Sequence, residues 1–241
     1  MTIRARVATL AIAALAWGAP ASAQVVQSIN VGFGAFFPRG FDSRARGDVL
    51  VEDLTTFDPL LFDIGEFKAG QIFGEWNVTF GRHVEVGVGL SYYSETVPSI
   101  YRDTLNQLPS GVTVEVPQDL RLRMSPLSGV VRLVAGREGG IQPYVGGGVA
   151  ALFWQYSEIG DFVDTTERTV FSDRYVASGT APAGLFIMGV RWPIGGDIYG
   201  LTTEWRYQFA SGNTGGTAAG FVNDKIDLSG GQLNFGFLVR F

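Results

Sequence analysis

The sequence predicts an all-β protein: an eight-stranded antiparallel up-and-down transmembrane β-barrel with short periplasmic turns and long extracellular loops. Three observations support this prediction. Apolar and polar side chains alternate along eight segments, the connections between segments are alternately long and short, and the final segment ends on an aromatic residue. Alternate residues of a strand face opposite sides, so each segment has one apolar and one polar face. A closed barrel with lipid outside and a polar interior accommodates both faces.

Residues 1–23 are predicted to be a secretory signal peptide that is cleaved near Ala23. Arg4 and Arg6 precede an apolar run over 7–17, and small residues follow at 21–23. The run is too short to span a bilayer as a helix, and no later stretch reaches the ~18 consecutive apolar residues that such a helix needs. Residues 24–241 are then expected to form one barrel domain, because a single all-β domain commonly reaches ~200 to 250 residues.

Composition excludes several classes of protein. The chain has no cysteine, which excludes a disulfide framework, a lipid-modified cysteine and a thiol nucleophile. It carries 18 Lys and Arg against 23 Asp and Glu, and loss of the signal peptide makes it more acidic. Because binding of nucleic-acid phosphates requires a basic surface, we expect no nucleic-acid partner.

The eight predicted strands cover residues 25–37, 70–80, 84–92, 119–133, 142–156, 175–192, 201–209 and 232–241. Long connections span 38–69, 94–118, 157–174 and 211–226, whereas those near 81, at 137–141 and at 193–197 are short. Both termini are therefore expected at the short-turn end, which is the periplasmic end in such barrels. Aromatic residues near the strand ends are predicted to form girdles at the two interfaces. They are Phe80, Tyr144, Trp192, Tyr199 and Phe241 at the short-turn end, and Phe37, Tyr92, Trp154 and Phe209 at the other.

The first four strands differ in how regular their alternation is. The predicted outward residues of the first three are Ile29, Val31, Phe33 and Phe37, then Trp76, Val78 and Phe80, then Val84, Val86, Val88, Leu90 and Tyr92. In the fourth, the apolar set before Pro126 is Leu120, Leu122 and Met124, and after it Leu127, Val131 and Leu133. This change of parity predicts a β-bulge at Pro126, which cannot donate to the ladder.

The last four strands include the clearest pattern. The fifth carries three glycines at 146–148, and its facing is ambiguous from the sequence. The outward set of the sixth is Phe186, Met188, Val190 and Trp192, and that of the seventh is Leu201, Thr203, Trp205, Tyr207 and Phe209. In the eighth, Leu233, Phe235, Phe237, Val239 and Phe241 face outward, opposite Gln232, Asn234, Gly236, Leu238 and Arg240.

With the signal peptide, segments 143–148, 204–207 and 235–241 carry a family resemblance. The chain resembles the eight-stranded outer-membrane β-barrel superfamily of Gram-negative bacteria, the OmpA, OmpX and OmpW type. The resemblance implies a place in the outer membrane, contact with outer-membrane lipid, and assembly by the barrel-assembly machinery, which reads the final aromatic strand in that family. The outward residues Leu233, Phe235, Phe237, Val239 and Phe241 would then be lipid contacts and assembly contacts at once.

The predicted inward-facing set is rich in charge. It holds Glu75, Glu85, Arg121, Arg123, Arg132, Arg191, Glu204, Arg206 and Arg240. The lumen of an eight-stranded barrel is only wide enough for side chains to fill it. We therefore expect these charges to pair into an internal salt-bridge network. The alternative is a narrow conduit whose arginine-rich constriction favours anions.

The long connections hold the remaining candidate chemistry. The first combines acidic residues with an apolar stretch, and Leu60, Leu61 and Phe62 are predicted to form a turn of helix packed over the barrel mouth. The alternative use of this stretch is an exposed patch for a partner or a hydrophobic ligand. The acidic residues have no EF-hand spacing, so no metal site and no cofactor are predicted.

Three functions stay open at this stage. The first is a non-enzymatic barrel that supports the envelope or presents its loops to partners; the second is a narrow channel for small or hydrophobic solutes; the third is a lipid-modifying enzyme. Barrel enzymes of the third kind use a histidine near the outer rim, whereas the single histidine, His83, lies beside a short turn. We therefore predict no enzyme and no catalytic residues. The sequence identifies neither the loop partner nor a solute.

Overall fold

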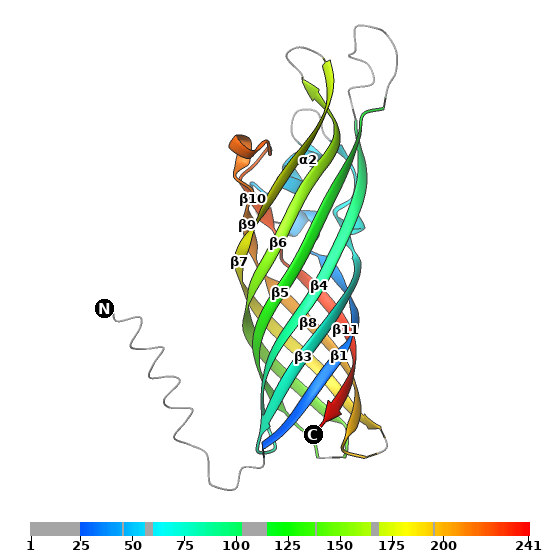
Figure 1. The fold of residues 1–241 in the computed structure, drawn as a ribbon, viewed down its shortest axis with the longest axis vertical. Helices are drawn as coiled ribbons and strands as arrows, with labels where there is room; N and C mark the ends of the chain where they lie inside the picture. Colours follow the sequence, from blue (N-terminus) through cyan, green and yellow to red (C-terminus); the bar gives the residue numbers. More distant parts are fainter. Residues whose placement is uncertain are drawn as a thin grey trace, which may run out of the picture.

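The computed structural model describes residues 25–44, 46–55, 60–102, 115–137, 139–164, 169–194 and 196–241. The predicted signal peptide, residues 1–23, lies outside the described residues. Eight strands form a closed antiparallel ring in the order β4-β3-β1-β11-β8-β7-β6-β5, and β5 pairs back to β4. Their bounds are β1 Val25–Pro38, β3 Ala69–Phe80, β4 Val84–Tyr101, β5 Pro117–Val134, β6 Gln142–Asp164, β7 Thr169–Ile194, β8 Tyr199–Phe209 and β11 Gly230–Arg240. The prediction of an eight-stranded antiparallel up-and-down barrel is confirmed (Figure 1).

The first and last strands close the ring. β1 pairs with β11 from Ser28↔Arg240 to Pro38↔Gly230. The backbone of Phe241 continues this pairing, because it donates to and accepts from Gln27 (2.9 and 3.2 Å). The apolar alternation of the last strand therefore continues to the end of the wall.

The two ends of the barrel differ in their connections. At one end, short turns join β3 to β4, β5 to β6 and β7 to β8, and β1 begins and β11 ends there (Figure 1). At the other end, the first long connection contains the 3-10 helix η1 (Phe41–Ser43), helix α2 (Val49–Thr55), strand β2 (Leu60–Leu61) and the 3-10 helix η2 (Ile64–Phe67). The fourth contains β9 (Ser211–Asn213), η4 (Gly216–Ala219) and β10 (Lys225–Asp227). Within the described ranges, no helix is both long and apolar enough to cross a membrane.

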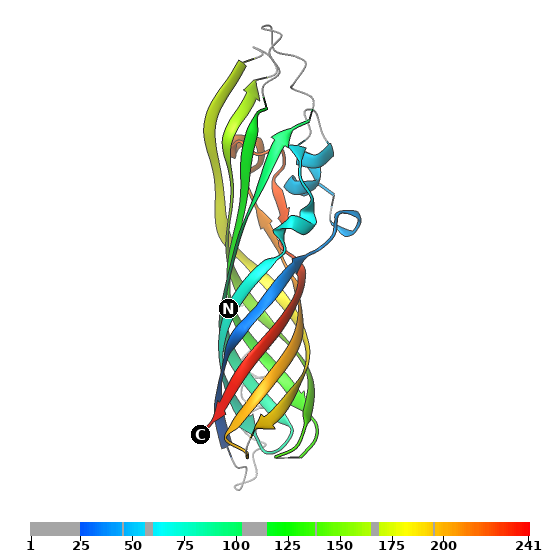
Figure 2. The same ribbon diagram turned by 90° about the vertical axis from the view of Figure 1, so that its right-hand side faces the viewer.

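The barrel consists of a full ring of eight strands and a half wall at the long-connection end. The half wall is formed by the parts of β4, β5, β6 and β7 that continue past the ring. β4, β5, β6 and β7 have 18, 18, 23 and 26 residues, whereas β1, β3, β8 and β11 have 11 to 14. The long strands continue past the ring as a curved sheet, and the first connection lies opposite its inner face (Figure 2). Parts of the predicted loops 94–118 and 157–174 are therefore strand.

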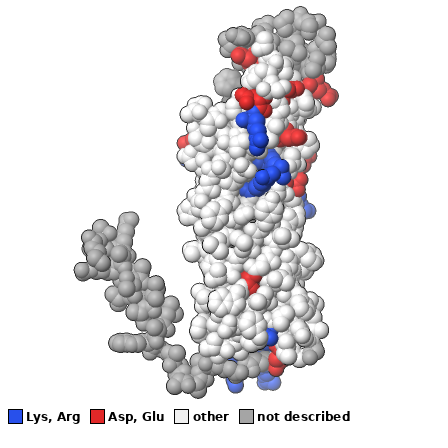
Figure 3. Space-filling view, viewed as in Figure 1, with Lys and Arg blue, Asp and Glu red and all other residues white. Residues whose placement is uncertain are grey.

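The part of the wall nearer the short turns has apolar side chains outside and polar ones inside. Phe33, Ile72 and Val149 are 63–70% exposed on the outer face. On the inner face Asn30, Glu75 and Asn234 are 6% exposed or less. The face in Figure 3 has a broad band almost free of charged residues, with most charges near the long-connection end. This is the arrangement that a lipid-facing wall requires.

The polarity of the wall reverses toward the long-connection end without any change in strand register. In β5, Leu127, Val131 and Leu133 face outward, whereas Leu120, Leu122 and Met124 are buried inside. The pairs Leu90↔Leu127 and Tyr93↔Met124 are separated by three residues on each strand, so no extra residue is inserted. The predicted bulge at Pro126 is therefore wrong. The apolar residues change face because the inner face of the wall packs against the long connections at this level, whereas the apolar band of the outer face has ended.

Two predicted girdle residues are also inside the barrel. Tyr144 and Trp154 lie on the inward face of β6 and are 6% and 5% exposed. The sequence left the facing of this strand ambiguous because its three glycines interrupt the alternation. Other predicted girdle residues, such as Tyr92 and Trp192, lie on the outer face.

Candidate functional site

Charged side chains cross the lumen of the ring and meet at Arg132. Its Nη2 lies 2.7 Å from Glu75 Oε1 and 2.8 Å from Glu204 Oε2. Its Nη1 donates to Asn77 Oδ1 (3.0 Å) and lies 3.4 Å from Glu85 Oε1. The three carboxylates come from β3, β4 and β8, so one guanidinium links three strands of the wall.

Two further arginines extend this group. Arg191 Nη2 lies 2.9 Å from Glu85 Oε2. Arg206 Nη2 lies 3.1 Å from Glu75 Oε2 and 2.8 Å from Glu204 Oε1. The side chains of these three arginines and three glutamates are at most 11% exposed. We call these six residues the lumen network. Because its formal charges balance, each buried charge has an opposite partner, which a low-dielectric interior demands.

Polar groups without charge surround the lumen network. The hydroxyl of Tyr144 donates to Glu204 Oε2 (3.2 Å), and the ring of Tyr144 faces the guanidinium of Arg132 at 5.4 Å. Nearer the long-connection end, Gln71 Nε2 donates to Asn234 Oδ1 (2.6 Å) and Gln232 Oε1 (3.1 Å). These hydrogen bonds satisfy amides that the alternation of β3 and β11 directs inward.

The structure brings six of the nine predicted lumen charges together and separates the other three. Arg121 and Arg123 alternate with the buried Leu120, Leu122 and Met124, so they lie on the outer face. Their assignment to the lumen is wrong, because the wall reverses its polarity between them and Arg132. Arg240 lies at the short-turn mouth, where its Nη2 donates to Gln142 Oε1 (2.5 Å).

The aromatic positions of the last strand lie on the outer face of the ring. Leu233, Phe235, Phe237 and Phe241 are between 36% and 66% exposed. Phe237 stacks against Tyr199 of the neighbouring strand, with ring centroids 5.8 Å apart. His83 lies at the short-turn end, where its Nδ1 is 3.0 Å from the carbonyl oxygen of Val134.

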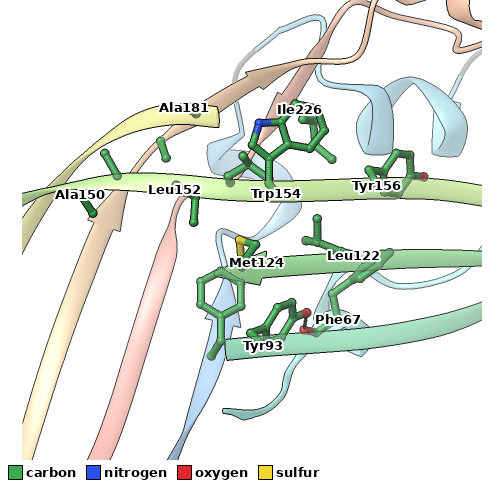
Figure 4. Packing of buried hydrophobic residues seen from close by; sticks show 14 of the residues in the cluster. Phe67, Tyr93, Leu122, Met124, Ala150, Leu152, Trp154, Tyr156, Ala181 and Ile226 are labelled. Carbon is green, nitrogen blue, oxygen red and sulfur yellow. Dashed lines mark hydrogen bonds between the residues drawn. The ribbon is translucent and has the colours of Figure 1, made fainter. Parts of the chain in front are cut away.

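The half wall and the first and fourth connections form a layer with an apolar core. We call this layer the cap. Trp154, Tyr156, Leu122, Met124 and Tyr93 project from the wall (Figure 4). They pack with residues of the first and fourth connections, which include Val49, Leu50, Leu60, Ile64, Phe67, Phe221 and Ile226. Leu60 enters this core from strand β2 and not from the predicted turn of helix, because Leu60 and Leu61 pair with Tyr101 and Ile100 beyond the end of β3.

Polar contacts join the two connections of the cap to each other. Asp48 is fully buried, binds Arg44 through an ion pair and accepts from the backbone N–H of Asp227 (3.1 Å). Arg44 Nη2 donates to the carbonyl oxygen of Asp227 (2.7 Å). Arg39 binds the carboxylate of Asp227 at 3.3 Å. The first connection is thereby fixed to the fourth.

Two buried carboxyl groups lie in the cap beside a tyrosine. Asp53 and Glu158 are each 5% exposed, and Asp53 Oδ2, Glu158 Oε1 and Tyr156 Oη have no hydrogen-bond partner among the described residues. Burial raises the pKa of Asp53 well above its usual range, and the negative charge of Glu158 raises it further. Burial also raises the pKa of Glu158, to about 7. The sequence did not reveal this group, because Glu158 falls in the predicted connection 157–174 and Asp53 in the predicted connection 38–69, so neither was assigned to an inward face.

A cavity of about 370 Å³ lies at the short-turn mouth, below the lumen network. Its polar lining includes Arg82, Gln142, Arg191, Asp197 and Arg240. Arg191 belongs to both the cavity lining and the lumen network, so the network forms the inner boundary of the cavity.

Comparison with known proteins gives structural neighbours only. No protein-family model and no curated protein sequence matches the chain. Its structure is similar to outer membrane protein OprG from Pseudomonas aeruginosa, with 14% identity and a TM-score of 0.46 over 91% of this chain and 97% of that one. It is also similar to Neisserial surface protein A, with 14% identity and a TM-score of 0.43 over 90% and 96%. The N-terminal β-barrel domain of P. aeruginosa OprF has 13% identity and a TM-score of 0.39 over 91% and 100%.

Proposed function

We propose that this chain is a non-catalytic integral protein of the outer membrane, with a sealed lumen and a rigid half wall that presents the cap to partners outside the cell. The apolar outer face of the ring supports membrane insertion, because Phe33, Ile72 and Val149 are more than 60% exposed and would otherwise face water. In this proposal the short turns are periplasmic and the cap is extracellular.

The position of Arg132 between Glu75 and Glu204 (2.7 and 2.8 Å) is the main support for a sealed lumen. These residues come from strands that do not pair with β5, so the contacts fill the interior and do not line a path along it. The apolar cap lies beyond them, and an ion would have to cross both layers. The charged groups are therefore expected to stabilise the barrel and not to conduct.

Export and assembly belong to the same proposal. Residues 1–23 would direct export and be removed near Ala23. The outward residues of the last strand, Leu233, Phe235, Phe237, Val239 and Phe241, would contact the barrel-assembly machinery first and membrane lipid afterwards. Their exposure on the outer face is compatible with both contacts.

Planar-bilayer recording tests the sealed lumen. The mature chain is reconstituted at increasing protein-to-lipid ratios, and insertion is verified by heat-dependent electrophoretic mobility, with a porin recorded in the same bilayers as the conducting control. We expect no stable unitary currents from the inserted protein. Reproducible single-channel steps would contradict a sealed lumen and favour a narrow channel.

A lipid-modifying activity is tested separately. Mass spectrometry of lipid A from cells with and without the protein should give the same profile. A mass shift that depends on the protein would contradict the non-catalytic proposal.

A further inference from the structure

Arg121 and Arg123 lie on the outer face of β5, directly beyond the apolar band. Along this strand the outward positions run Leu133, Val131, Gly129 and Leu127, then Ser125, Arg123 and Arg121. Ser125 pairs with the outward-facing Phe153 of β6, which is 48% exposed. The two arginines are therefore the first charged residues that follow the apolar surface of this strand.

Neither arginine has an acidic partner among the described residues, in contrast to every arginine of the lumen network. Arg123 Nη1 has one weak contact, with Gln155 Oε1 at 3.5 Å. The Nε atoms of Arg121 and Arg123 are buried without a hydrogen-bond partner. The stems of both side chains therefore lie against the wall, while the side chains are in part accessible.

The neighbouring outward positions offer hydrogen-bonding groups without charge. Arg123 pairs in register with Ser94 and Gln155, and Arg121 pairs with Thr96 and Ser157. The nearest acid on the same face of the strand is Asp119, and the structure has no ion pair between it and either arginine. The surface formed by Arg121, Arg123, Ser94, Thr96 and Gln155 is thus positively charged and can donate several hydrogen bonds. We call it the arginine surface.

We propose that the arginine surface binds the phosphate groups of a phosphorylated glycolipid of the outer leaflet. This inference rests on the proposed membrane location. Guanidinium groups bind phosphate oxygens through paired, charge-assisted hydrogen bonds. A lipid whose acyl chains lie on Leu127, Leu90 and Phe153 would place its headgroup next to Arg123 and Arg121. One molecule can thus contact the apolar band and the arginine surface together.

Lipid titration by native mass spectrometry tests this proposal. The purified mature protein in non-ionic detergent is titrated with bis-phosphorylated lipid A, and separately with lipid A that has been dephosphorylated. We expect R121Q/R123Q to bind the phosphorylated form at least tenfold more weakly than the wild type. We expect dephosphorylated lipid A to bind the wild type and this variant equally.

Two further variants separate charge from geometry. R82Q removes one positive charge from the short-turn end of the barrel and should bind phosphorylated lipid A as the wild type does. R121K/R123K keeps the charge but loses the planar fork, and its affinity should lie between those of the wild type and R121Q/R123Q. Equal binding of phosphorylated lipid A by the wild type and R121Q/R123Q would overturn the proposal.

A soluble probe distinguishes binding of a lipid phosphate from binding of a free phosphate anion. Inorganic pyrophosphate is expected to compete only at concentrations at least a hundredfold above those of lipid A. Binding of pyrophosphate as tight as that of lipid A would overturn the lipid assignment and leave a site for free anions. Failure of the proposed function would appear elsewhere, as channel currents or absence of insertion in the bilayer experiment.

Discussion

Arg132 on β5 and Glu204 on β8 meet inside the barrel, with 2.8 Å between Nη2 and Oε2. Neither strand pairs with the other in the ring, so this contact spans the lumen. The same nitrogen atom contacts Glu75, and Nη1 contacts Asn77. The lumen network thus connects parts of the wall that backbone hydrogen bonds do not connect directly.

We expect Arg132→Met to destabilise the barrel strongly. The substitution leaves Glu75 and Glu204 with reduced compensation, and removal of one partner from a buried ion pair costs about 3 to 5 kcal/mol. Urea unfolding in lipid vesicles, followed by electrophoretic mobility, measures this loss. R82A, which removes an exposed arginine, should change the free energy of unfolding by less than about 0.5 kcal/mol.

A double variant checks the cause of that loss. Arg132→Met combined with Glu204→Gln leaves two arginines and two glutamates in the lumen network, with Arg206 3.1 Å from Glu75 and Arg191 2.9 Å from Glu85, and should recover part of the stability. If this double variant is less stable than Arg132→Met alone, charge compensation is not what the lumen network provides.

On the outer face, Phe237→Arg should block membrane assembly. An arginine on the lipid side of a barrel costs about 2 to 4 kcal/mol near the bilayer midplane and less near the interface, so Val239→Arg should be milder. On the inner face, Asn234→Ser loses the hydrogen bond from Gln71, which costs about 1 kcal/mol. The yield of heat-modifiable protein in outer-membrane fractions compares these variants. Greater damage from Asn234→Ser than from Phe237→Arg would reverse the assigned faces of β11.

The cap should be more stable at pH 5 than at pH 8. The folded-state pKa of Glu158 is raised to about 7, whereas an unfolded glutamate has a pKa of about 4.3. The folded cap therefore binds the proton more tightly, and this stabilisation is lost as the pH rises through about 7. The raised pKa of Asp53 acts in the same direction. Hydrogen-exchange protection of α2, corrected for the intrinsic rate at each pH, measures the effect.

Glu158→Gln combined with Asp53→Asn provides the control for this pH dependence. Both amides stay neutral at both pH values, so most of the difference in protection between pH 5 and pH 8 should disappear. Protection of wild-type α2 that is constant or increases with pH would show that the buried carboxyl groups do not control the cap.

Gly212→Val should loosen the hairpin of β9 and β10 from the half wall. A Cβ atom at Gly212 would lie 2.6 Å from the ring of Trp154 and 2.9 Å from Ile226. Such overpacking costs about 1 to 3 kcal/mol, and hydrogen exchange of residues 225–227 should accelerate. Gly129→Val is the matched control, because no atom lies within 4 Å of its added Cβ. Equal exchange in both variants would contradict close packing of Gly212 under Trp154.

The sequence alone determined the number of strands, their antiparallel order and the inward position of six charged residues. Alternation with period two assigns each residue to a face, and Glu75, Glu85, Arg132, Arg191, Glu204 and Arg206 all lie where the outer neighbours are apolar. In this region the environment outside the wall is uniform, so the polarity of a side chain is enough to predict its direction.

Only the tertiary structure decided the direction of Arg121, Arg123 and Trp154, and the existence of the cap. The strands continue past the apolar band, and there the inner face packs against α2, β2 and the fourth connection, which are distant in sequence. Apolar residues then turn inward and charged residues outward with no change in register. The alternation of apolar and polar residues does not show at which level along the barrel this reversal occurs. That level depends on what covers each face of the wall.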